Sequence, residues 1–188
     1  MKQCCLSRHL LRAAASFFWG EPHCRSPVSA YITIRCADQL TDEERALLGT
    51  PVAADLHRRD GVLRCATGLS IASVTALVVT SRVPQPARLE LGIAAAGPVD
   101  HAAPHLGEVC TPLGRALHGL GITREQLTTA ATPGYLDEEG TEVAVLSVAR
   151  LWTPSGWPLA LVTERVHAQF LSAYPPPWPL ARTKARST

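Results

Sequence analysis

The chain has 188 residues, of which 46% are apolar and 18% charged, so it is not an intrinsically disordered chain and can bury a hydrophobic core. The net charge is +2, but basic residues dominate both ends and leave the central part acidic. An acidic centre argues against a nucleic-acid-binding face on the folded part, because phosphate binding depends mainly on Lys and Arg.

The charge pattern divides the chain into three segments. We expect residues 1–40 to form a basic, poorly ordered extension, residues 41–172 a single α+β domain, and residues 173–188 a basic tail rich in Pro and Trp. The first residues resemble a targeting presequence, and a translation start further downstream is the alternative interpretation. Because no apolar stretch reaches about 18 residues, the sequence predicts no membrane association and a cytoplasmic location.

The cysteines do not form the paired Cys-x-x-Cys spacing of zinc sites and redox centres. A disulfide scaffold is also not expected in a chain with this much apolar sequence. Glycine-rich nucleotide-binding patterns are absent as well. The sequence therefore predicts no cofactor and no metal site.

Two short helices are expected near the start of the central domain. Thr41 and Glu44 form the capping-box pattern that opens a helix, and this helix is expected to end after Leu48 at a glycine. A proline then favours a second helix over Val52–Arg59, which an Asp-Gly pair would end.

Strands and one further helix follow. Val74–Val83 is rich in β-branched residues and predicts a strand, and alternation in Ala87–Ile93 predicts a second strand that pairs with it as a hairpin. Pro112–Leu120 predicts a helix followed by a glycine. Glu142–Trp152 and Leu159–Val166 predict a second hairpin across a Pro-Ser-Gly turn.

A short sequence repeat suggests that the domain is built from a duplicated unit. The pattern Thr-Pro-x-x-x-x-Leu-His occurs at Thr50–His57 and again at Thr111–His118, each time before a predicted hairpin. The sequence thus predicts an α+β fold in which a duplicated helix-plus-hairpin unit forms one antiparallel sheet covered by helices.

The second copy also resembles a known family. The helix segment Thr111–Leu117 (Thr-Pro-Leu-Gly-Arg-Ala-Leu), the strand segment Val148–Leu151 (Val-Ala-Arg-Leu) and the Ser-Gly-x-Pro turn at residues 155–158 are similar to the chorismate lyase/UTRA superfamily. The resemblance covers residues 109–166. It implies a duplicated unit around one antiparallel sheet, in agreement with the repeat.

The resemblance implies a stand-alone domain that binds a small anionic metabolite, like the effector-binding domains of GntR-type regulators. It places Arg150 and Glu164 at the ligand. Arg165, beside Glu164, and Trp157, at the second hairpin turn, are further candidates for ligand binding. An arginine fork suits this role, because it binds carboxylate or phosphate through two hydrogen bonds. The resemblance is also compatible with a homodimer.

Two other functions remain open. The lyase members of the family imply release of pyruvate from chorismate, for which Arg150, Arg165 and Glu164 could serve. The lyase motif does not match this sequence residue by residue, so catalytic residues stay unassigned. The second alternative is a non-catalytic accessory protein that binds a partner through the Pro/Trp tail.

Simpler structural roles compete with each candidate residue. Arg150 and Glu164 could form a cross-strand ion pair, and Trp157 could pack across the hairpin. His101 and His105 suggest metal ligands, but loop histidines in water are the favoured interpretation. Gly68–Ala72 lacks the second glycine of a nucleophile elbow.

Overall fold

The computed structural model describes residues 29–36, 40–49, 56–65, 68–93, 109–110 and 113–173, with backbone alone at 29–36 and 109–110. In chain order the elements are β1 (Ser29–Cys36), α2 (Asp42–Leu48), β2 (Leu56–Arg64), β3 (Ser70–Val79), the 3-10 helix η2 (Thr80–Arg82), α3 (Gln85–Glu90), β4 (Val109–Cys110), α4 (Leu113–Ala116), β5 (Thr123–Leu136), β6 (Glu142–Trp152), β7 (Pro158–His167) and α5 (Ala168–Ala173). None of the helices within these ranges is long and apolar enough to cross a membrane.

The strands form one antiparallel sheet in the order β4-β1-β2-β3-β7-β6-β5. Strands β1 to β3 form one meander and strands β5 to β7 another, and the pair β3–β7 joins them at the centre of the sheet. The predicted fold class, an α+β fold with one antiparallel sheet covered by helices, is therefore confirmed. The repeated unit differs from the predicted helix-plus-hairpin unit, because each half contributes a meander of three strands. In the first half, β3 pairs with β2, which precedes it, and not with Ala87–Ile93 as predicted.

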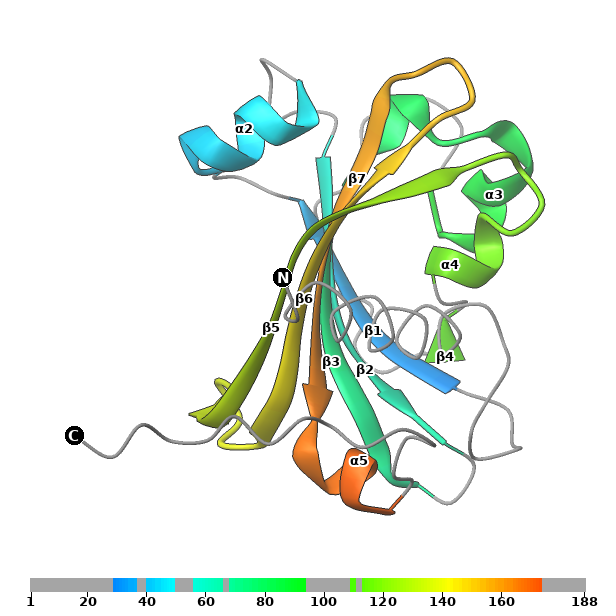
Figure 1. The fold of residues 1–188 in the computed structure, drawn as a ribbon. Helices are drawn as coiled ribbons and strands as arrows, with labels where there is room; N and C mark the ends of the chain where they lie inside the picture. The colour runs from blue at the N-terminus through cyan, green and yellow to red at the C-terminus, as the bar shows by residue number, and fades with distance from the viewer. Residues whose placement is uncertain are drawn as a thin grey trace.

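Helices cover both faces of the upper sheet (Figure 1). We call the face that bears Arg59, Ala76 and Val162 the α4 face, because α3 and α4 pack on it, and we call the opposite face, which bears Arg58 and Leu77, the α2 face. Side chains alternate between faces along each strand. A shift of one residue along a strand therefore moves from a side chain on the α4 face to a side chain on the α2 face.

Apolar clusters lie on both faces. The larger cluster, between the α4 face and the helices α3 and α4, includes Val78, Leu91, Leu117 and Val162. At the lower end of the same face, Phe170 of α5 packs with a second cluster. On the α2 face, fully buried Leu48 packs against Leu56, Leu77, Val79 and Leu161.

Helix α2 confirms the capping-box prediction. The Oγ1 atom of Thr41 accepts a hydrogen bond from the Glu44 amide, and the Glu44 carboxylate accepts one from the Thr41 amide at 2.8 Å. Gly49 ends the helix in the left-handed conformation, with φ of 56°. Arg82 then binds the carbonyl oxygens of Leu48 and Gly49, which holds the end of α2 against the sheet.

The predicted helix over Val52–Arg59 is wrong from Leu56 onward, where β2 begins. The Asp60-Gly61 pair does not end an element but lies inside this strand, opposite Thr75 and Val74 of β3. Pairing with two neighbouring strands overrides the local signal, because successive residues of β2 form ladder hydrogen bonds alternately with β1 and β3. Residues 50–55, which include the start of the predicted helix, lie outside the described part.

The predicted strand over Ala87–Ile93 is also wrong. Residues Gln85–Glu90 form α3, which begins after a proline at its N-cap. Leu89 is 89% exposed, whereas Ala87 and Leu91 are buried. The buried positions are four residues apart, the spacing of a helix face, so the alternation in the sequence had indicated the wrong period.

The second half follows the prediction at its hairpin and departs from it at β5. Strands β6 and β7 form the predicted hairpin, and β3 covers most of the strand predicted over Val74–Val83. No element was predicted from the sequence over the long edge strand β5. The division into segments 1–40, 41–172 and 173–188 stays a prediction, although β1 places a strand of the sheet inside the first segment and most of the tail lies outside the described residues.

Candidate functional site

A mostly apolar cavity lies between the α4 face of the sheet and α4 itself. Its volume is about 40 Å³, whereas about 10–15 Å³ suffices for one water molecule. The residues that line it are Arg59, Gly61, Leu63, Val74, Ala76, Leu113, Gly114, Leu117, Ile122, Thr123, Arg124, Leu151 and Val162. The cavity therefore suits a compact occupant, with contacts from β2, β3, β5, β6, β7 and α4.

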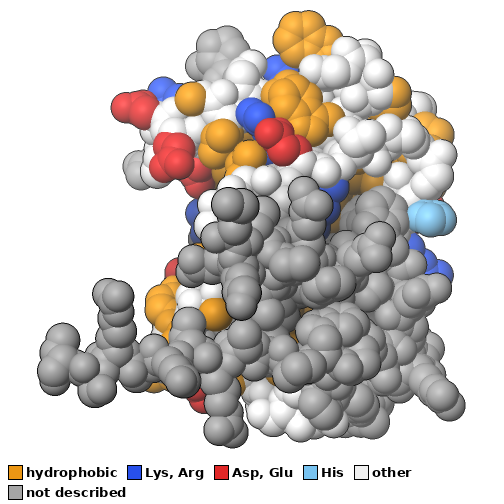
Figure 2. Space-filling view, in the orientation of Figure 1, with side chains coloured by type: hydrophobic (Ala, Val, Ile, Leu, Met, Phe, Trp, Pro, Cys, Tyr) orange, Lys and Arg blue, Asp and Glu red, His pale blue; other side chains and the backbone are white. Residues whose placement is uncertain are grey.

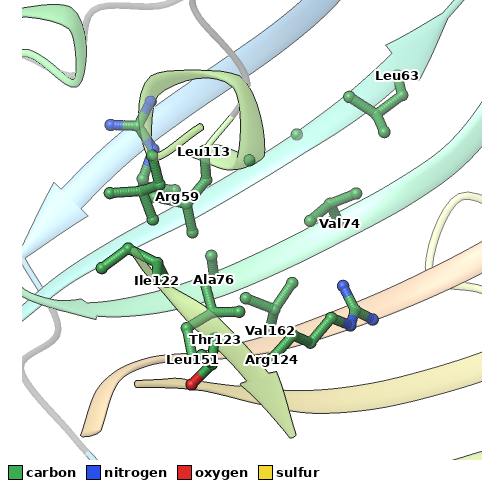
Figure 3. A pocket seen from close by; sticks show the side chains of 13 residues that line it. Arg59, Leu63, Val74, Ala76, Leu113, Ile122, Thr123, Arg124, Leu151 and Val162 are labelled. Atoms are coloured by element: carbon green, nitrogen blue, oxygen red, sulfur yellow. The ribbon is translucent and has the colours of Figure 1, made fainter. Parts of the chain in front are cut away.

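Two arginines are the charged residues of this lining. Arg59 comes from β2 and Arg124 from β5, and their side chains lie on opposite sides of the cavity with Leu113 and Ala76 between them (Figure 3). Arg59 is 3% exposed, and its Nη1 atom donates a hydrogen bond to the Leu91 carbonyl oxygen at 2.6 Å. A buried guanidinium in an apolar wall is costly unless oxygen atoms surround it.

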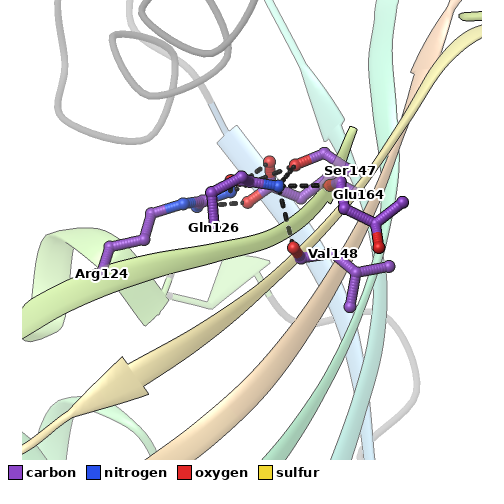
Figure 4. Close-up of polar contacts among 6 residues, drawn as sticks. Arg124, Gln126, Ser147, Val148 and Glu164 are labelled. Carbon is purple, nitrogen blue, oxygen red and sulfur yellow. Dashed lines mark hydrogen bonds and ion pairs between the residues drawn. The ribbon is translucent and has the colours of Figure 1, made fainter. Parts of the chain in front are cut away.

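Arg124 makes a two-point ion pair with Glu164 of β7 (Figure 4). Its Nη1 atom lies 2.7 Å from Glu164 Oε1, and its Nη2 atom lies 3.1 Å from Oε2. Gln126 donates to Ser147 at 3.0 Å and to the carbonyl oxygen of Val148 at 2.8 Å, which holds the polar group together from β5 and β6.

Glu164 itself is fully buried on the α4 face, opposite Ser147 of β6 and Val74 of β3. Burial raises the pKa of Glu164, while the Arg124 guanidinium and the Ser147 hydroxyl act in the opposite direction. The carboxylate therefore depends on Arg124 to keep its charge. Any group that competes for this guanidinium acts on Glu164 as well.

The four residues predicted from the sequence are not brought together at one site. Arg150 lies on the α2 face of β6, where its Nη2 atom is 2.7 Å from Glu125 Oε2 and its Nη1 atom donates to the Leu47 carbonyl oxygen. The guanidinium also lies 4.4 Å from the ring centroid of Trp152. Figure 2 shows hydrophobic, basic and acidic side chains gathered at this upper end of the molecule.

Arg165 and Trp157 occupy two further places. Arg165 lines a polar depression of about 290 Å³ on the α2 face, together with Asp60 and Asp137. Trp157 lies at the β6–β7 turn, is 59% exposed and has the Arg82 guanidinium 5.6 Å from its ring centroid. It does not line the cavity on the α4 face, so its contact with a ligand there stays a prediction without a geometric basis.

The cross-strand pair between Arg150 and Glu164 is not formed. Arg150 lies opposite Leu161 in the register of β6 and β7, whereas Glu164 lies opposite Ser147. Ser147 and Arg150 are an odd number of residues apart, so their side chains point to opposite faces. The partner of Glu164 is Arg124, and the partner of Arg150 is Glu125.

The sequence interpretation missed both cavity arginines. Arg59 was expected at a helix end, and no element was predicted at Arg124. The available signal for Arg124 was alternation in the first residues of β5, where Arg124 and Gln126 share one face. His57, which was expected to bind carbonyls at a helix end, lies in β2, where burial and nearby Arg59 lower its pKa.

Other candidates from the sequence do not add to this site. His101 and His105 lie outside the described residues. Within the described ranges, no group of three or more His, Cys, Asp or Glu side chains is arranged to hold a metal ion. Ser70 begins β3 and pairs with Arg64, so it does not follow a strand as a nucleophile elbow does.

Comparison with known proteins supports the fold and leaves the ligand open. No protein-family model matches this sequence, and no curated protein sequence matches it. Among solved structures, the chain is similar to the possible transcriptional regulator YydK from Bacillus subtilis, with a TM-score of 0.50 and 12% identity over 78% of this chain and 61% of that chain. It is also similar to the effector domain of PhnF from Mycobacterium smegmatis, with a TM-score of 0.49 and 13% identity over 76% of this chain and 82% of that domain.

The similarity to YydK agrees with the fold that the sequence resemblance implied. This chain spans less than two thirds of the length of YydK. YydK is described as a possible transcriptional regulator, so this comparison does not support the chorismate lyase alternative.

Proposed function

We propose that this chain is a small-molecule-binding domain, similar to the effector-binding domains of GntR-type regulators, and that its ligand is a small anion. The observation that carries the proposal is the cavity on the α4 face, which has Arg59 on one side and Arg124 on the other. The similarity to YydK supports the fold of such a domain.

The chemistry of the two arginines favours an anion. A guanidinium presents several N–H donors in a fixed plane that matches the oxygen atoms of carboxylate, phosphate or sulfate. The remaining lining is mostly aliphatic, including Leu113, Leu117 and Val162. An apolar wall strengthens these electrostatic interactions, because little water is present to screen them.

The small volume narrows the class of ligand. A space of about 40 Å³ fits a few water molecules, so the occupied part of a ligand is compact. We therefore expect the anionic group itself to enter the cavity. Phosphate, sulfate and small carboxylates are the appropriate first probes.

A thermal-denaturation screen tests the proposal at constant ionic strength. A ligand at 100 times its Kd stabilises the folded state by about 2.7 kcal/mol, which raises Tm by about 5–10 °C for a chain of this length. We expect at least one of these anions to raise Tm in a saturable way. A rise that grows linearly with concentration would reflect general salt stabilisation instead.

Two matched substitutions decide where the anion binds. Arg124→Lys keeps a positive charge beside Glu164 but loses the fork, so we expect affinity to fall about tenfold or more, the equivalent of one charge-assisted hydrogen bond. Arg165→Lys is the control. Arg165 is next to Glu164 in β7, and its side chain points to the opposite face of the sheet, the α2 face. Loss of binding in Arg165→Lys or Arg150→Lys, with Arg124→Lys unaffected, would instead support the α2 face and the residues predicted from the sequence.

A further inference from the structure

Arg124 connects the cavity to a carboxylate that does not line it. Arg124 lines the cavity, and its guanidinium holds both oxygen atoms of Glu164 at 2.7 and 3.1 Å. An anion that enters the cavity therefore approaches a cation that already has a bound carboxylate.

The surroundings of Glu164 leave few other charges to compensate a new one. Among the described residues, Arg124 of β5 and Arg59 of β2 are the charged groups on this part of the α4 face, and the Ser147 hydroxyl of β6 contacts both Arg124 and Glu164. The neighbouring positions of β3 and β7 are apolar, as are the residues of α4 that line the cavity. His57 is a titratable group on the same face, but it lies two strands away from β7.

Binding of an anion at Arg124 places a second negative charge close to the buried Glu164 carboxylate. Two negative charges at one buried cation repel each other, and one of them is then neutralised by a proton, as in paired carboxylates. Building on the proposed anion site, we propose that anion binding in the α4-face cavity is coupled to the uptake of about one proton by Glu164. The domain thus binds an anion and a proton together.

The environment of Glu164 already shifts its titration towards the neutral form. Burial raises the pKa of this carboxyl group even with Arg124 beside it, and a second anion raises the pKa further. The bound state therefore holds more protons than the free state between these two pKa values. By linkage, affinity increases as pH falls, by at most about tenfold per pH unit in that window.

Isothermal titration calorimetry with sulfate tests the coupling directly on the full chain. Sulfate stays fully ionised near neutral pH, so the ligand itself contributes no proton. At one pH, titrations in two buffers of different ionisation enthalpy give the number of protons taken up from the difference in observed enthalpy. We expect about one proton per sulfate.

Three outcomes are distinguishable in the wild-type protein. Uptake of about one proton supports the coupling. Sulfate binding without proton uptake overturns the coupling and leaves the anion site in place. If neither sulfate nor any other anion of the thermal screen binds, both the proposed function and the coupling are removed.

Two variants assign the proton to its residue. Glu164→Gln keeps the shape of the side chain and one acceptor oxygen for Arg124 but cannot titrate, so we expect uptake to disappear while sulfate still binds. His57→Asn is the matched control for a second titratable group on the same face, and we expect it to retain uptake. Loss of uptake in His57→Asn with uptake preserved in Glu164→Gln would overturn the assignment.

Discussion

Replacing Arg124 by methionine isolates the cost of leaving the Glu164 carboxylate without its partner. The side chain of Glu164 is 1% exposed and that of Arg124 is 16% exposed, so solvent screens this ion pair only slightly. The substitution removes two charge-assisted hydrogen bonds but keeps most of the length and the apolar stem of the side chain. Its main effect is therefore electrostatic.

The expected loss in the free energy of unfolding is about 3–5 kcal/mol, the range observed when one partner of a buried ion pair is removed. An independent route gives a similar value, because each of two charge-assisted hydrogen bonds contributes about 1.5–3 kcal/mol. The loss is limited by protonation of Glu164, which costs about 1.4 kcal/mol for each pH unit above its pKa.

Urea denaturation at neutral pH measures this effect, with equal m-values for variant and wild type as the check on two-state unfolding. The pKa of Glu164 is raised in the folded state, so folding binds protons in this window, and the deficit of Arg124→Met should shrink as pH falls. The double variant Arg124→Met/Glu164→Met should recover most of the loss, since no unpaired charge remains. A single variant that loses less than about 1 kcal/mol, or a double variant no more stable than the single one, would refute this reasoning.

Three further predictions concern stability elsewhere. Leu48→Ala, at a fully buried contact of α2, should cost about 2–5 kcal/mol in urea denaturation, whereas a loss below 1 kcal/mol would show that α2 does not depend on this contact. Thr41→Ala removes the N-cap oxygen and should cost about 1 kcal/mol in the same assay, with Thr41→Ser as the neutral control. Burial lowers the pKa of His167, so the unfolded chain binds more protons below about pH 6.5 and stability should fall as the solution becomes acidic. The pH dependence of Tm should become flatter in His167→Gln; an unchanged profile would assign acid sensitivity to other groups, such as Asp137.

Local sequence signals determined the elements whose residues interact with near neighbours. The capping box of α2 needs only Thr41 and Glu44, three residues apart, and the β6–β7 hairpin needs only two apolar runs and a turn. Such patterns have the same meaning in any tertiary context, because the partners are set by chain geometry. The fold class followed from these elements together with the repeat.

Only the tertiary structure decided which charged residue meets which. Arg124 and Glu164 are forty residues apart, and their contact depends on the register of β5, β6 and β7 and on the face that each strand presents. Because side chains alternate with a period of two, a shift of one residue would exchange the α4 face for the α2 face. The sequence alone therefore indicated arginine as the chemistry of the site. Our proposal of Arg59 and Arg124 in place of Arg150 and Arg165 depends on the pairing of the sheet.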